Sequence, residues 1–191
     1  MIRFRLGRFG IKRSELKLFA FNLKGEISTI NAGKEVDVGI YDRPIKSELI
    51  KKSTVEERLN RGEVLFLAKD NSGEIGYLFA TKSRCWVSEV EDWFEVEDSE
   101  VYLYDAFTKE EHRGMHIYPF LIYQAVRHFK TQDLSQALIF STAANRSSIK
   151  GIARARFSIY QTVNFLNLCG LRIWKLSTRR CDVRSRFRVE G

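Results

Sequence analysis

The chain has 191 residues, of which 44% are hydrophobic and 29% charged. This length and balance suit a globular protein with a buried core and exclude a disordered or fibrous chain. No apolar run approaches the ~20 residues of a membrane-spanning helix, so no membrane span is expected. Because the sequence has only two prolines, no repeat and no low-complexity segment, we predict one domain over residues 1–191.

The net charge of +8 lies at the two ends of the chain. Residues 1–24 contribute +6 and residues 170–191 contribute +5, which leaves the residues between them net negative. We define two basic terminal segments, 1–15 and 177–191. Solvated ends are the simpler interpretation, although nucleic acid is a partner that such ends would suit.

Cysteine usage and the first residues indicate a cellular compartment. The start of the chain interleaves arginine with apolar residues and lacks the apolar core of a secretory signal. Cys85, Cys169 and Cys181 are odd in number and far apart. They fit neither a disulfide framework nor a metal knuckle, so we expect a reducing, cytoplasmic location.

In the first half of the chain, period-two alternation and turn residues predict strands. A capping box at Ser53-Thr54-Val55-Glu56 predicts a helix that stops before Gly62. The turn signals are Lys24-Gly25 and the stronger hairpin sequence Asp70-Asn71-Ser72-Gly73. The expected strands are Ile2–Leu6, Leu16–Leu23, Glu26–Ile30, Val36–Tyr41, Val64–Lys69 and Glu74–Thr81.

The stretch from Val101 to Phe157 is predicted to run strand, turn, helix, strand, helix. Its strands are Val101–Thr108 and Leu138–Thr142. A turn from His112 leads into a helix that Pro119 prevents from starting much before Tyr118, and Asn145 opens a second helix ending near Phe157. A strand followed by a loop at a helix N-terminus can cradle phosphate, because free N–H groups and the helix dipole point outward there. The core-facing stripe of the first helix would be Ile117, Leu121, Ala125 and Phe129.

The C-terminal part is predicted to close the sheet with Ser158–Leu166 and Arg172–Leu176. Arg186–Val189 alternates with period two, as does Ile2–Leu6. We expect both termini to be strands, paired with each other and presenting an arginine-lined face.

The segment before Val101 is strongly acidic: Glu89–Glu100 holds seven acidic residues in twelve, with Trp93 and Phe94 among them. Aromatic faces beside carboxylates suit a cationic amine. A solvated, partly mobile loop is the commoner structure for such a run, and we favour it here.

The run Arg113-Gly114-Met115-His116-Ile117-Tyr118-Pro119 resembles the pyrophosphate loop of the GNAT family of acyl-CoA-dependent N-acetyltransferases. The family signature is Arg/Gln-x-x-Gly-x-Gly/Ala, and some members have Arg-Gly-x-Gly-Ile-Tyr-Pro. The spacing from Asn145 to Phe157 is also similar to that of the family. The resemblance covers about residues 53–176. The sequence departs from the family at His116 and Arg156, which replace glycines, and at Ile152, where many members have a tyrosine.

The resemblance implies an α/β fold: a single domain with a mixed central sheet of about six to seven strands, flanked by helices. The parallel strands Val101–Thr108 and Leu138–Thr142 would splay apart around acetyl-CoA, with no metal required. His112 and His116 mimic metal-ligand spacing, but no third ligand is near. The expected cofactor-binding residues are Phe107, Thr108, Lys109, Arg113, Gly114, Met115, His116, Ile117, Tyr118, Asn145 and Ser148.

Catalysis of acetyl transfer needs a base for the amine and an acid for the leaving thiolate. Asp105 is the only carboxylate in its strand and is the expected base, with Tyr104 beside it. Because Ile152 takes the place of the family's usual tyrosine acid, Tyr160 or Tyr118 would have to serve. Direct loss of the thiolate is the alternative, since a thiol with pKa near ~8.5 is a fair leaving group.

The resemblance thus predicts an acetyl-CoA-dependent N-acetyltransferase that acts by direct attack of a primary amine, carried by a small molecule or a protein. One alternative is a non-catalytic module of the same fold whose basic ends bind nucleic acid or a partner. Another is an aminoacyl or peptidyl transferase that uses charged tRNA. The acceptor, and whether the chain forms a homodimer, are left open.

Overall fold

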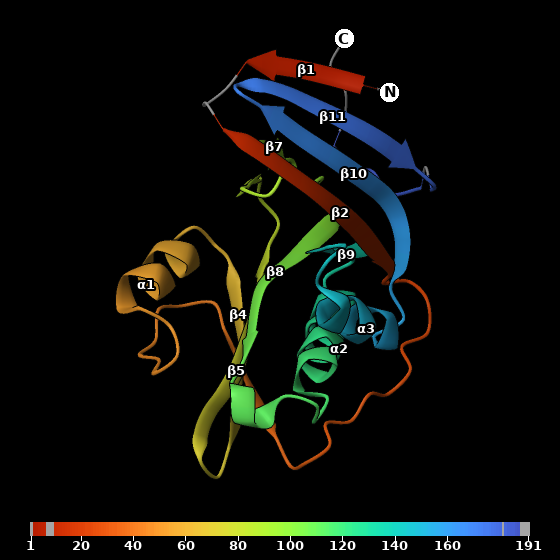
Figure 1. The fold of residues 1–191 in the computed structure, drawn as a ribbon. Helices are drawn as coiled ribbons and strands as arrows, with labels where there is room; N and C mark the ends of the chain where they lie inside the picture. Colours follow the sequence, from red (N-terminus) through yellow and green to blue (C-terminus); the bar gives the residue numbers. More distant parts are fainter. Residues whose placement is uncertain (1, 7–9, 181, 188–191) are drawn as a thin grey trace.

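The computed structural model describes residues 2–6, 10–180 and 182–187 (Figure 1). Within these residues, nine strands form one mixed sheet in the order β1-β11-β10-β2-β9-β8-β5-β4-β3, and β6 and β7 form a separate hairpin. The strands are β1 (Ile2–Leu6), β2 (Ile11–Asn22), β3 (Asp37–Tyr41), β4 (Val64–Asp70), β5 (Gly73–Thr81), β6 (Cys85–Val87), β7 (Asp92–Phe94), β8 (Glu100–Thr108), β9 (Gln136–Thr142), β10 (Ser158–Leu168) and β11 (Leu171–Thr178). The helices are α1 (Lys52–Asn60), the 3-10 turn η1 (Glu110–His112), α2 (Ile117–Lys130) and α3 (Arg146–Arg154).

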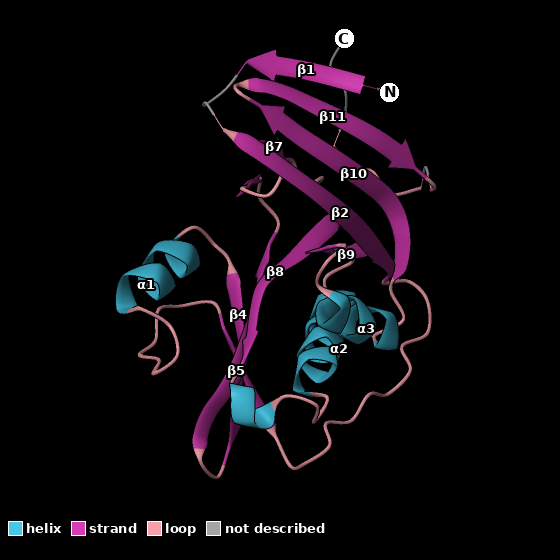
Figure 2. Ribbon diagram, viewed as in Figure 1, coloured by secondary structure: helices cyan, strands magenta, loops and turns pink. Residues whose placement is uncertain are grey.

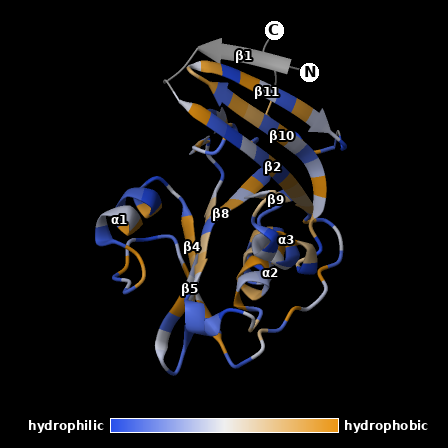
Figure 3. Cartoon of the chain, in the orientation of Figure 1, coloured by the Kyte–Doolittle hydropathy of each residue, from blue (hydrophilic) through white to orange (hydrophobic). Residues whose placement is uncertain are grey.

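Helices cover both faces of the sheet (Figure 2): α2 and α3 lie on one side of β4, β5 and β8, and α1 lies on the other. Alternate residues of each strand serve the two sides, as the period of a strand requires. On β4, Phe66 and Ala68 pack towards α2, whereas Leu65 and Leu67 pack towards α1. Figure 3 shows the resulting hydrophobic colouring along β4, whose residues 65–68 are all buried.

The α1 side of the sheet has a second cover farther along, made by the β6–β7 hairpin and residues 183–187. Val87, Phe94 and Phe187 pack there against Tyr102 of β8 and Trp174 of β11. Backbone groups of the C-terminal segment are held by buried side chains. Glu100 accepts hydrogen bonds from the Arg184 and Ser185 N–H groups, both at 2.8 Å, and the Tyr160 hydroxyl donates to the Ser185 carbonyl at 2.8 Å.

The expected strands and helices of residues 64–178 are confirmed with small shifts in their ends. Helix α2 starts at Ile117, so Pro119 lies in its first turn, where no intrahelical N–H bond is needed. All four residues of the predicted stripe are buried. The helix opened by Asn145 ends at Arg154, three residues earlier than expected.

Several expectations for the N-terminal half are wrong. Glu26–Ile30 is not a strand, because both edges of β2 are already paired with β9 and β10. Instead Ile27 and Ile30 pack against the core on the α2 side. The capping box is not formed either. Lys51 caps α1 with its carbonyl, which accepts from the Thr54 and Val55 N–H groups.

The termini and the acidic segment also differ from expectation. β1 pairs antiparallel with β11, and the described residues 182–187 form no strand, so the two termini do not pair with each other over these residues. Arg188, Val189 and the arginine side chains of Ile2–Leu6 lie outside the described part. The acidic segment contains strand β7, because Asp92 and Phe94 are buried while Trp93 between them is exposed. The sheet has nine strands instead of six to seven: β1 and β3 form its two edges, and β2 lies in its interior between β10 and β9.

A cluster of three side chains ties the loop after β2 to the turn before α2. Lys34 forms an ion pair with Asp70 at the β4–β5 turn, and its Nζ lies 3.4 Å from Nδ1 of His112 in η1. The Lys34 hydrogen bond, together with those from Ser72, holds the pKa of Asp70 well below its usual range. The cluster therefore fixes the position of the chain that enters α2.

Replacing Asp70 with asparagine should change the acid dependence of stability. A carboxyl whose folded pKa is depressed adds stability above its unfolded pKa of about 3.9, and this contribution disappears as the pH falls towards the folded pKa. Asp70→Asn should therefore lower the thermal midpoint at pH 7 and flatten its fall between about pH 4 and pH 2. Calorimetry across that range tests this, with the exposed Asp98→Asn as the matched control. An unchanged slope in Asp70→Asn would contradict the ion pair.

Replacing Tyr160 with phenylalanine should destabilise the fold. Tyr160 is fully buried, and the variant would leave the Ser185 carbonyl without its hydrogen-bond donor. We expect a loss of about 1–2 kcal/mol in the free energy of unfolding, measured by chemical denaturation. Tyr123→Phe on α2 is the control. Equal stability of the two variants would show that the Tyr160 hydroxyl does not hold the C-terminal segment.

Candidate functional site

The site begins where β8 and β9 separate. The two strands run parallel and pair from Glu100–Leu103 to Gln136–Ile139, and their ladder then ends although both strands continue. β8 stays paired with β5 up to Thr108, and β9 stays paired with β2 up to Thr142. Each strand therefore turns an edge without a β partner towards the gap, with backbone N–H and C=O groups that need other partners.

A cavity of about 960 Å³ fills this gap. It is lined on the α2 side by Leu103 and Ile139, and on the α1 side by Tyr102, Tyr104 and Phe140. Because neighbouring strand residues point to opposite faces, a cavity lined by both sets passes through the sheet. Two ligands could therefore meet in it from opposite faces.

The end of the cavity on the α2 side is cationic. The η1 turn and the first turn of α2 bring His112, Arg113 and His116 to it, and α3 adds Lys150 and Arg154. The Arg113 side chain is 60% exposed and lies 3.5 Å from Glu110. With the free N–H groups of the α2 N-terminus beside these side chains, this end suits an anionic group such as a phosphate.

His116 occupies a backbone conformation that favours glycine. Its φ is +60°, in the left-handed region, immediately before α2. A side chain there costs roughly 1 kcal/mol relative to glycine. Arg156, the other residue in place of a family glycine, has φ of +65°. Both positions at which the resemblance implies glycine thus have a backbone conformation that glycine favours. His116 Nδ1 accepts a hydrogen bond from Arg154 Nη1 at 2.9 Å, which fixes its ring.

Asn145 caps α3 in the way predicted for a helix N-cap. Its side-chain oxygen accepts the Ser148 N–H at 3.0 Å. The Ser148 hydroxyl lies 3.2 Å from the Tyr118 hydroxyl of α2. Burial raises the pKa of Tyr118 to about 12. The Tyr118 ring lies against Gly151, where an added Cβ would come within 2.6 Å of a ring carbon, so α2 and α3 can approach only because residue 151 is glycine.

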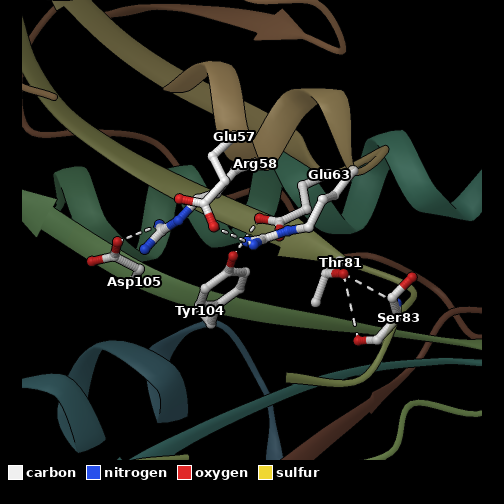
Figure 4. A network of polar contacts seen from close by, with 8 residues as sticks. Glu57, Arg58, Glu63, Thr81, Ser83, Tyr104 and Asp105 are labelled. Atoms are coloured by element: carbon white, nitrogen blue, oxygen red, sulfur yellow. Dashed lines mark hydrogen bonds and ion pairs between the residues drawn. The ribbon is translucent and has the colours of Figure 1, made fainter. Parts of the chain in front are cut away.

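Two polar pairs lie between β8 and α1 on the other side of the sheet (Figure 4). Asp105 forms an ion pair with Arg58, and the Tyr104 hydroxyl donates a hydrogen bond to Glu63. Burial and the Glu63 carboxylate raise the pKa of Tyr104 above its ordinary value. Arg61 contacts Glu63 as well, at 2.9 Å.

A β-bulge sets the directions of the Tyr104 and Asp105 side chains. Asp105 and Ala106 of β8 oppose only Leu78 of β5, and Asp105 has φ of +46°. Such an extra residue bends a strand and redirects its side chains. As a result, Tyr104 and Asp105 both line the cavity although they are consecutive in the chain.

The structure brings most of the predicted site residues together. The cavity is lined by Tyr104, Asp105, Phe107, Thr108, Arg113, Gly114, His116, Ile117, Tyr118, Asn145 and Ser148. Lys109, Met115 and Tyr160 are not among its lining residues. The Lys109 N–H donates to Ile75, the Met115 carbonyl accepts from Gly33, and Tyr160 is buried in the core against the C-terminal segment.

Sequence reasoning missed several lining residues. The helix carrying Lys150 and Arg154 was predicted, and their four-residue spacing could have placed both on one face of it. Trp86 and Glu89 line the opposite end of the cavity, but the acidic segment near them was interpreted as a solvated loop. Gly151 could not have been found, because its importance depends on its contact with Tyr118.

Within the described residues, no group of three or more His, Cys, Asp or Glu side chains is arranged to hold a metal ion. His112 and His116 face different partners, Lys34 and Arg154 respectively. In the same part of the chain, no helix is both long and apolar enough to span a membrane.

Comparison of the structure with solved structures finds a consistent likeness. An acetyltransferase of the GNAT family from Colwellia psychrerythraea has 14% identity and a TM-score of 0.52, with 91% of this chain and 59% of that one covered. A GCN5-related N-acetyltransferase from Sphaerobacter thermophilus has 9% identity and a TM-score of 0.57, with coverage of 93% and 56%. A tandem GNAT protein of the clavulanic acid pathway has 10% identity and a TM-score of 0.53, with coverage of 92% and 55%.

No protein-family model and no curated protein sequence matches the chain. The chain spans between half and three fifths of the length of the three solved structures above. At such low identity the likeness concerns the fold. The chain is therefore a divergent protein of the GNAT fold.

Proposed function

We propose that the protein is an acetyl-CoA-dependent N-acetyltransferase that joins its two substrates in one complex. The carrying observation is the single cavity through the sheet, cationic at one end and lined by aromatic rings and carboxylates at the other. A donor and an acceptor entering from opposite faces would meet between β8 and β9. The names of the similar structures, which are acetyltransferases, support this class of reaction.

The cationic end would hold the phosphates of the donor. Arg113, Lys150 and Arg154 supply charge, and the amides that precede α2 supply N–H donors. The edges of β8 and β9 that lack a β partner would form hydrogen bonds with the amides of the pantetheine arm. On β8 these edge residues include Phe107 and Thr108. The thioester supplies the acetyl group when bound, and the chain positions its carbonyl carbon in the gap.

The other end would take the acceptor amine and its proton. The Tyr104 hydroxyl is already hydrogen-bonded to Glu63, so it can accept a proton from the amine while it passes its own to that carboxylate. Asp105 is the second candidate base. Both carboxylates have an arginine partner, Arg58 for Asp105 and Arg61 for Glu63, but Glu63 in addition holds the hydroxyl of Tyr104, which lines the cavity. We assign the relay to Tyr104 and Glu63, and a supporting role to Asp105.

Proton donation to the leaving thiolate falls to Tyr118 in this scheme. Its hydroxyl lines the cavity beside Ser148, whereas the Tyr160 hydroxyl is bonded in the core. Tyr118 is a weak acid because burial raises its pKa to about 12. The thiolate can also depart without a proton, since a thiol with a pKa of about 8.5 is a fair leaving group.

Calorimetric titration with CoA tests the donor site. We expect binding, and Arg113→Ala should weaken it by about two- to fivefold, because an exposed ion contact is worth up to ~1 kcal/mol. Arg127→Ala on the exposed side of α2 is the matched control and should bind as the wild type does. Absence of CoA binding at millimolar concentration would sink the proposed function. Salt-sensitive binding to nucleic acid in its place would favour a binding module or a tRNA-dependent transferase.

Kinetics of two variants distinguish the candidate bases. Tyr104→Phe should lower kcat by about 100-fold or more, the usual contribution of a positioned acid–base group, while the CoA affinity stays unchanged. Asp105→Asn should lower kcat less. Thermal denaturation of Tyr104→Phe and of the wild type shows whether the loss of the hydrogen bond to Glu63 also destabilises the fold. A larger effect of Asp105→Asn than of Tyr104→Phe would reverse the assignment.

A further inference from the structure

We propose that the hairpin end of the cavity is an acceptor subsite for a short alkyl diamine, an amine that carries a second ammonium group. This inference rests on the proposed function and names its acceptor class. It concerns Cys85, Trp86, Val87 and Glu89, which line the cavity from the β6–β7 hairpin.

The hairpin forms one wall of the cavity. Val87, Val90 and Phe94 anchor it in the core, and Trp86 packs edge-on against Trp93 with ring centroids 5.6 Å apart. Trp86 nevertheless remains 49% exposed. A large aromatic side chain that is anchored below and open above presents a ready surface for a ligand.

The floor next to this wall is aromatic too. Tyr104 stacks on Tyr102 at 5.5 Å, and Tyr102 stacks on Phe140 at 5.1 Å, with interplanar angles of 15° and 16°. The stack crosses from β8 to β9, and all three rings line the cavity. It suits an apolar chain that runs from the hairpin towards the gap between the strands.

Three carboxylates lie near the Cys85 thiol at the hairpin end of the cavity. Burial, and then the carboxylates of Glu63, Glu95 and Glu89, raise the pKa of the Cys85 thiol to about 12. Glu63 and Glu95 have arginine partners, Arg61 and Arg84. Glu89 lines the cavity, and its hydrogen bond is with the Ser88 hydroxyl at 3.2 Å.

The hairpin already holds one cation on an indole. The Arg84 guanidinium lies 4.8 Å above the ring of Trp93, on the part of the hairpin that does not line the cavity. A ligand ammonium over Trp86 would repeat this contact inside the cavity, with Glu89 as its counter-ion. An amine without a second charge would make neither contact, and a carboxylate-bearing amine would be repelled.

The reaction at this subsite balances. The neutral amine nitrogen of the diamine forms a bond to the thioester carbonyl carbon, and the C–S bond breaks with its electron pair left on sulfur. The proton of the amine passes to the Tyr104–Glu63 pair. The far ammonium at Trp86 and Glu89 takes no part in bond changes. The products are a mono-acetylated diamine and a thiolate, which takes a proton from Tyr118 or, after leaving, from solvent.

The test compares 1,5-diaminopentane with n-hexylamine, which has the same chain length but a methyl group in place of the second amine. For the full chain we expect kcat/KM with the diamine to exceed that with the monoamine by about 10- to 30-fold. Glu89→Gln and Trp86→Ala should each raise the KM of the diamine roughly 5- to 10-fold and leave the KM of acetyl-CoA unchanged. Glu35→Gln, an exposed carboxylate that does not line the cavity, is the charge-matched control.

A binding measurement distinguishes a failure of the diamine subsite from a failure of the proposed acetyltransferase function. Titration of the diamine in the presence of CoA should change tryptophan fluorescence in the wild type and much less in Trp86→Phe. If CoA binds but hexylamine is used as well as the diamine, or if Glu89→Gln keeps full preference, the subsite assignment is overturned and the acetyltransferase proposal stands. If CoA does not bind, both fall.

Discussion

The structure depends on one interruption of hydrogen bonding, the end of the β8–β9 ladder after Leu103 and Ile139. Both strands are held on their other edges, by β5 and β2, so they cannot close the gap. Backbone groups in the gap must then find partners outside the sheet. The bulge at Asp105, the start of α2 and the cap of α3 all lie around this gap, and together they convert a break in the sheet into a lined cavity.

Local signals made the central frame predictable. The hairpin residues at Asp70–Gly73, the position of Pro119 and the capping side chain of Asn145 each act over a few residues, and each was confirmed. Glu26–Ile30 alternates as a strand does, but β2, the partner that a tight turn at Lys24-Gly25 would give it, is already paired on both edges with β9 and β10. Tyr160 was predicted as a proton donor from its position in the sequence alone. It lies on the face of β10 that packs into the core, so its side chain is buried there. What remained unpredictable depends on contacts across long stretches of chain, such as Arg58 with Asp105 and Tyr104 with Glu63.

His116 and Arg156 show that a backbone conformation favouring glycine can carry a larger side chain. Both residues have positive φ values, and α2, α3 and β10 fix the chain around them. The strain of roughly 1 kcal/mol each is small against the packing of these elements. At His116 the side chain joins Arg154 at the cationic end of the cavity.

The contact of Tyr118 with Gly151 makes two distant positions one steric unit. The ring takes the space that a methyl group at residue 151 would need, so neither position can change freely while the other is kept. In a set of related sequences, glycine at the middle of α3 should accompany an aromatic residue in the first turn of α2, and larger residues there should accompany a smaller partner. The distance between α2 and α3 at the site thus depends on this pair of residues. A comparison of related sequences could identify the pair even where the sequence of the cofactor loop differs.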